Sequence, residues 1–126
     1  MLATHAEHDR VLDLEPVTEV ATILAAQEAA AAVHATEPLR RYVVELAAAT
    51  RADGRVELGA SRRAGLLLFR AAKALAALEG RDHVLPDDVQ ALAVPLLRHR
   101  LLLAPGSGAE DREAAIRDAI ARVPAL

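Results

Sequence analysis

The stretch from Ser61 to Gly80 constrains the fold of this 126-residue chain more than any other segment. Ser61 is a favourable N-cap residue, and Gly80 stands where a glycine commonly ends a helix. Between them, apolar residues recur at helical spacing. The face that this spacing predicts to be buried consists of Ala64, Leu67, Leu68, Ala71, Ala74, Leu75 and Leu78. A helix with one apolar face must pack on neighbours, so the segment predicts a helical bundle.

Four further segments carry helix signals. A first helix is expected over about Glu19 to Val33, with Thr18 as its N-cap. A second should begin near Glu37 or Pro38, since proline suits the first helical turn. Its apolar stripe is Leu39, Tyr42, Val43, Leu46 and Thr50. Another helix should begin at Pro86, with Pro95 kinking it or splitting it in two. The last is expected over about Ala109 to Arg122, with Ala115, Ile116, Ala119 and Ile120 on one side.

The connections between these helices are read from their turn residues. Gly54 is expected to be left-handed, and Val56 to Leu58 alternates like a short extended piece. Residues 104–108 read Ala-Pro-Gly-Ser-Gly and predict a flexible break.

Composition supports an all-helical domain. The chain holds 30 alanines and 20 leucines but two aromatic residues, Tyr42 and Phe69, which disfavours an all-β fold. We therefore expect an all-α, compact bundle of four to six helices. Residues 1–16, closed by Pro16, are interpreted as a linker arm, and residues 17–126 as the helical domain. The N-terminus lacks signal-peptide features and no apolar run could span a membrane, so a cytoplasmic protein is expected.

Catalytic and metal-binding chemistry is sparse. The absence of cysteine excludes disulfides, cysteine-ligated zinc and a thiol nucleophile. His5 and His8 are three residues apart, but no carboxylate cluster accompanies them, so no metal site and no catalytic residue is predicted. Asp87 and Asp88 are interpreted as helix-start charges rather than an acid–base pair. The net charge of -3 disfavours nucleic acid as a partner.

The segment from Gly59 to Arg63 is the candidate binding site. Arg62 and Arg63 would lie in the first turn of a helix that Ser61 caps. Cations are disfavoured at this positive end, and guanidinium groups beside free N–H groups form a corner that attracts anions. The alternative is that both arginines simply reach solvent or a nearby acid.

Three ordered motifs give the chain a family resemblance. They are Leu58-Gly-Ala-Ser-Arg-Arg-Ala64, Gly80-Arg-Asp-His-Val-Leu-Pro-Asp-Asp-Val89 and Leu97-Arg-His-Arg100. Together with the upstream Leu39-x2-Tyr-Val-Val-x-Leu-x3-Thr-Arg51, they resemble the C-terminal lid of MoxR-family AAA+ ATPases over about Leu12 to Leu103. Arg62 stands where the family has proline, His83 where it has tyrosine, and Leu85 where a capping threonine or serine is common. The last change weakens a helix start unless Asp87 substitutes for the missing cap.

The resemblance implies a role and partners. Arg63 matches the sensor 2 arginine, which reaches the γ-phosphate of ATP on an upstream domain, and Arg62 either assists or competes with it. Gly59, Ala60 and Ser61 belong to the same motif. The parent protein would bind ATP and Mg²⁺, while this chain alone would hold no cofactor and lacks a phosphate loop. Implied partners are the ATPase core, neighbouring subunits of a hexameric ring, and von Willebrand factor A domain proteins in chaperone-like remodelling.

Two readings of the chain's context follow. The first is that it is a piece of a longer ATPase, and the second is that it is a free-standing helical protein–protein interaction module. A DNA-binding module is disfavoured because the arginines are scattered rather than gathered on one stripe.

Overall fold

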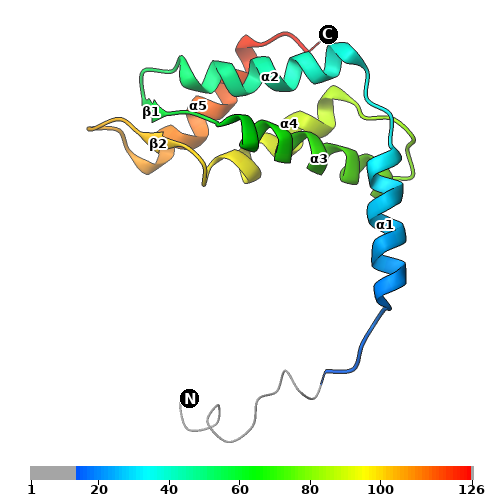
Figure 1. Cartoon of the computed structure of the whole chain (residues 1–126). Coiled ribbons are helices and arrows are strands. Elements are labelled where there is room, and N and C mark those ends of the chain that lie inside the picture. Colours follow the sequence, from blue (N-terminus) through cyan, green and yellow to red (C-terminus); the bar gives the residue numbers. More distant parts are fainter. Residues whose placement is uncertain (1–13, 126) are drawn as a thin grey trace, which may run out of the picture.

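A computed structural model of the chain describes residues 14–125 as a bundle of helices with one small β-ribbon (Figure 1). The helices are α1 (Val20–Ala32), α2 (Glu37–Arg51), α3 (Arg62–Leu78), α4 (Pro86–Leu97) and α5 (Ala109–Arg122). Strands β1 (Val56–Leu58) and β2 (Leu102–Leu103) pair antiparallel. Five helices in the described part of the chain confirm the predicted all-α bundle.

Helix α2 follows its sequence pattern closely. Thr36 caps it by accepting a hydrogen bond from the Leu39 amide at 3.3 Å, and Pro38 lies in the first turn. The whole predicted stripe is buried, and Ala47 joins it. Helix α5 has the predicted bounds and packs on α2 and α4, burying Ala115, Ile116 and Ala119.

Helix α3 lies at the centre of the bundle, in contact with α1, α2 and α4. Its fully buried positions are Ala64, Gly65, Leu68, Ala72 and Ala76. The predicted face is therefore right at Ala64 and Leu68 and wrong at Leu78, which is 85% exposed. The other predicted positions are half-buried. Contacts from more than one side of α3 place its fully buried positions elsewhere. Small residues fill the most crowded positions, where neighbouring helices come close.

Helix α4 is a single helix from Pro86 to Leu97, so the predicted split at Pro95 is wrong. Pro95 is exposed, on the side of α4 that faces away from the core. No side-chain cap is present at the start of α4, as expected of Leu85, and Asp88 rather than Asp87 is the acid engaged there. Its carboxylate accepts a hydrogen bond from the Leu85 amide at 2.8 Å.

One loop prediction is confirmed and one is corrected. Gly80 ends α3 with a φ of 73°, as predicted, but the second left-handed glycine is Gly106 and not Gly54. The residues ahead of Gly106 pair with the segment around β1. Val56 pairs with Leu103, and the Ala104 amide donates to the Arg55 carbonyl at 2.9 Å.

Helix α1 projects away from the other four helices (Figure 1). It buries no residue, and it begins after Glu19 without a side-chain cap, so the predicted cap by Thr18 is wrong. Backbone hydrogen bonds hold its base, from the His34 amide to the Asp82 carbonyl at 2.7 Å and from the Val84 amide to the His34 carbonyl at 3.0 Å. None of the helices within residues 14–125 combines the length and apolarity needed to cross a membrane.

Candidate functional site

The five candidate residues form one continuous segment between β1 and the first turn of α3. Ser61 caps α3 as predicted, accepting a hydrogen bond from the Ala64 amide at 3.2 Å. Arg62 and Arg63 are the first two helical residues, and both side chains are exposed. Neither guanidinium pairs with a carboxylate of residues 14–125. The alternative interpretation, that both arginines simply reach solvent or a nearby acid, therefore keeps only solvent within the described residues.

Two residues at the end of α2 hold the segment in place. The buried Thr50 hydroxyl accepts a hydrogen bond from the Ala60 amide at 2.9 Å and donates to the Ala47 carbonyl at 2.8 Å. The Arg51 guanidinium donates to the Ala60 carbonyl at 2.6 Å. Both backbone polar groups of the fully buried Ala60 are thus satisfied by α2, which fixes where α3 begins.

Gly59 is required by the close approach of these two segments. A Cβ at this position would lie 2.6 to 2.8 Å from the Cγ, backbone nitrogen and Cα of Arg51. Because two of these atoms are backbone, no side-chain movement could make room. The motif glycine therefore allows the contact through which Arg51 reaches Ala60.

Thr50 and Arg51 are candidates that the sequence analysis did not identify. It placed Thr50 in a helix and Arg51 in the break after it, and it assigned neither a role. The available signal was the hydroxyl of Thr50 on an otherwise apolar stripe. A polar group at a buried position needs a hydrogen-bond partner, and here the partner is the motif backbone.

Arg62 and Arg63 point into different surroundings. Arg62 lines an apolar groove of about 460 Å³ between α2 and α3, and Arg63 does not. The groove, called here the α2–α3 groove, is walled by Val43, Val44 and Ala47 of α2 and by Gly65, Leu66 and Phe69 of α3. Arg40 and Arg51 also line it. The two adjacent arginines therefore have different surroundings. Arg62 lines the groove, and Arg63 lies outside it in the first turn of α3.

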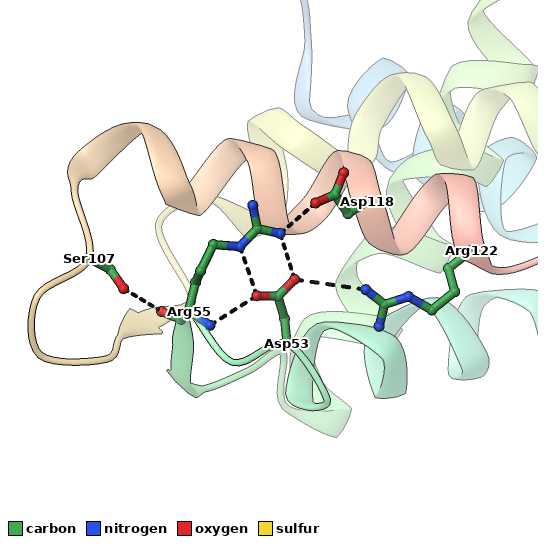
Figure 2. Close-up of polar contacts among 5 residues, drawn as sticks. All are labelled: Asp53, Arg55, Ser107, Asp118 and Arg122. Carbon is green, nitrogen blue, oxygen red and sulfur yellow. Dashed lines mark hydrogen bonds and ion pairs between the residues drawn. The ribbon is translucent and has the colours of Figure 1, made fainter.

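An ion-pair cluster anchors the turn after α2 to α5 (Figure 2). Arg55 donates to both carboxylate oxygens of the buried Asp53, at 2.9 and 2.7 Å, and to Asp118 of α5 at 2.5 Å. The hydrogen bond from Arg55 lowers the pKa of Asp53 to about 2, although burial opposes the shift. The Arg55 carbonyl also accepts from the Ser107 hydroxyl at 3.3 Å. The cluster thus fixes the turn that leads from α2 to β1, directly ahead of the candidate segment.

A second buried carboxylate, Asp88, has the same kind of structural role. Arg81 donates to its two oxygens at 2.8 and 2.6 Å, and these hydrogen bonds lower the pKa of Asp88. Asp87 is exposed, so the two acids do not form a catalytic pair. This agrees with their interpretation as helix-start charges.

The histidines do not assemble into a site within the described residues. His34 and His83 lie in neighbouring backbone segments, and His83 pairs with Asp82 at 2.8 Å, which lowers the pKa of Asp82. Among residues 14–125, no three histidine or acidic side chains are grouped as metal ligands. His5 and His8 lie outside the described residues.

Comparison with known proteins gives a consistent result. The family described as the AAA lid domain matches residues 48–120, which include the whole candidate segment. YeaC, an uncharacterized protein of Bacillus subtilis (strain 168), is 38% identical over 112 residues, covering 87% of this chain and 35% of its own length.

Two further matches extend the comparison. The chaperone MoxR1 of Mycobacterium tuberculosis is 38% identical over 98 residues, covering 71% of this chain and 26% of its own. A crystal structure from Cytophaga hutchinsonii, of a protein provisionally assigned as an ATPase, superposes with a TM-score of 0.64 at 32% identity. It covers 73% of this chain and 32% of its own. The chain thus spans between about a quarter and a third of the length of these three proteins.

Proposed function

This chain belongs to the AAA lid domain family, as the lid of a MoxR-like AAA+ ATPase, and we propose that Arg63 is the residue through which it senses bound ATP. The observation that carries the proposal is the way α2 fixes the start of α3. Thr50 and Arg51 hold Ala60, Ser61 caps the helix, and the Arg63 guanidinium extends from its first turn without an ion-pair partner in the described chain.

The chemistry of this helix end suits a phosphate. Free N–H groups at a helix N-terminus and a guanidinium both bind anionic oxygens, and charge-assisted hydrogen bonds are stronger than neutral ones. ATP itself supplies the γ-phosphate charge, and its hydrolysis removes the group that Arg63 would contact. Because Arg63 is coupled through Ala60 to α2, a pull on Arg63 would move the lid as one body.

Arg62 has a different role in this proposal. It stands in place of the family's first-turn proline and lines the α2–α3 groove, which supports a role other than competing for the phosphate. Mg²⁺ would be held together with ATP by the upstream ATPase domain.

The context of the lid is part of the same proposal. The upstream ATPase domain would precede residues 1–16, which would serve as the linker, and residues 17–126 would form the lid. The parent would assemble as a hexameric ring in the cytoplasm and remodel partner proteins in a chaperone-like manner, with von Willebrand factor A domain proteins as candidate partners. The chaperone name of the M. tuberculosis relative supports this direction.

The test is ATP turnover by the parent protein carrying single substitutions in the lid. Arg63→Ala should lower turnover about tenfold or more, the scale expected for loss of a charge-stabilising group. Arg62→Ala should have a much smaller effect, and Arg70→Ala, an exposed arginine further along α3, should have none. Normal turnover by Arg63→Ala would remove this residue from the sensing role, and a drop confined to Arg62→Ala would exchange the two assignments.

The second candidate, a free-standing helical interaction module, is favoured by the α2–α3 groove and by the exposed helix α1. The mass of the native protein separates the two. A chain near 13.4 kDa would favour the module, and a much longer one with a phosphate loop would favour the lid.

A further inference from the structure

The α2–α3 groove combines an apolar lining with a positively charged rim. Val44 and Leu66 are 65% and 48% exposed, which is unusual for large apolar residues on opposite walls of one groove. Arg40 and Arg51 lie on the α2 side and Arg62 on the α3 side. Such a surface fits a helix that is apolar on one face and acidic on its flanks.

Helix α1 has this chemistry. Residues 14–33 contain three glutamates and no lysine or arginine. Val20, Ile23 and Leu24 share one face by helical spacing, and they are 77%, 47% and 53% exposed. Glu19 and Glu28 lie on the two sides of that face, as the same spacing requires. The α1 helix is 13 residues long and α2, which forms one wall of the groove, is 15, so their lengths match.

Within residues 14–125, the apolar face of α1 is left exposed. Contact with the bundle is made near the base of α1, where Ala29, Ala32 and Val33 line a small cleft together with Ala77 and Arg81, and where Lys73 donates to the Ala31 carbonyl. Helical spacing puts Ala29 opposite Val20 and Leu24. The base lies at the end of α3, whereas the groove lies along its first half, so α1 cannot reach the groove of its own chain without breaking the His34–Asp82 and Val84–His34 hydrogen bonds.

We propose that α1 of one copy docks into the α2–α3 groove of a second copy. Val20, Ile23 and Leu24 would pack between Val44 and Leu66, and the glutamates flanking them would face the arginines of the rim. The contact is head to tail, since a different surface of each copy is used, and such contacts build rings or filaments. The inference goes beyond the proposed function, because it requires neither ATP nor Arg63.

The natural absence of cysteine makes a direct test simple. Leu24→Cys and Leu66→Cys are made as separate variants of the 126-residue chain, mixed, and oxidised mildly. We expect a disulfide-linked heterodimer to form at least tenfold faster than in a mixture of Leu24→Cys with Glu57→Cys, an exposed control on β1. Equal rates in the two mixtures would overturn the proposal.

A charge exchange tests the same contact without cross-linking. Sedimentation equilibrium of the unmodified chain should give an average mass that rises above 13.4 kDa with concentration, and Arg62→Glu should lower this association. Mixing Arg62→Glu with Glu19→Arg should restore it, because the pair recreates the attraction with reversed signs. Both side chains are exposed, and far-UV circular dichroism controls for folding. A monomer mass at every concentration up to the high micromolar range would overturn the proposal and leave the sensing role of Arg63 untouched.

Discussion

Helices α1 and α3 are both rich in alanine, yet they have opposite places in the molecule. Helix α3 is capped by Ser61, ends at the left-handed Gly80 and contacts three other helices. Helix α1 has no side-chain cap and buries no residue. The difference teaches that apolar content alone does not place a helix in a core. Helix α3 has an apolar face and a charged face. In α1, alanines lie on most sides of the helix, and the larger aliphatic residues form only a narrow face.

The largest expected effect separates the two helices by core packing. Leu68→Ala in α3 should lower the free energy of unfolding by about 3 kcal/mol, because Leu68 is fully buried and truncation leaves a cavity. The matched change in α1, Leu24→Ala, should alter it by less than about 0.5 kcal/mol. Urea unfolding followed by circular dichroism measures both, and equal losses would mean that α1 is buried in solution.

A smaller effect tests the ion-pair cluster that holds the body of the lid but does not touch α1. Arg55→Ala should lower the free energy of unfolding at neutral pH, because it leaves the Asp53 carboxylate without its main partner. Arg117→Ala, which breaks an exposed pair with Glu113, should cost under about 0.5 kcal/mol.

The same cluster predicts that the free energy of unfolding falls at acidic pH. The folded-state pKa of Asp53 is about 2, below its ordinary value of 3.8. Ionised Asp53 therefore stabilises the fold above about pH 4, and this contribution is lost as the pH falls toward 2. Unfolding free energies measured from pH 7 to 2 should fall less steeply in Arg55→Ala than in the unmodified chain. Parallel curves would assign this fall to other carboxylates.

An intermediate effect concerns the junction that positions α3. Thr50→Val keeps the shape of the side chain but removes the acceptor for the buried Ala60 amide, at a cost of about 1–2 kcal/mol. Hydrogen exchange at the Ala60 amide should become faster, and Thr50→Ser should restore protection. Unchanged exchange in Thr50→Val would show that Arg51 alone holds the segment.

The smallest effect compares the two helix starts. Ser61→Ala should cost about 1 kcal/mol, the usual value of a lost N-cap, whereas Glu19→Ala should cost almost nothing. Glu19→Ser should raise the helicity of α1 by supplying the missing cap. Backbone chemical shifts of the first turn report each change, and a loss of helicity in Glu19→Ala would mean that Glu19 caps α1 in solution.

The sequence predicted those parts of the fold that depend on local pattern. The stripe from Leu39 to Thr50, the bounds of α5 and the cap at Ser61 follow from periodicity and capping chemistry within one segment. The buried face of α3 was displaced because several helices surround it, and no periodicity within α3 reveals where they lie. Pro95 did not divide α4, because its side of the helix is exposed and the remaining turn is held by packing.

For the candidate site, too, the sequence predicted only what depends on one segment. The motif segment and its two arginines were identified from the sequence, but the tasks of Thr50 and Arg51 depend on contact between the end of α2 and Ala60. The separation of Arg62 from Arg63 depends on which side of α3 lies against α2. Both are properties of the packed molecule rather than of a segment.

The two backbone hydrogen bonds of His34 have a mechanical consequence. They fasten α1 to the loop that follows α3, so α1 acts as a lever whose fulcrum is that loop. A helix of 13 residues is about 20 Å long, and a tilt of about 10° at its base would displace its free end by about 3 Å. A small rearrangement among α3, α4 and their loop would therefore cause a larger displacement at the N-terminal end of α1.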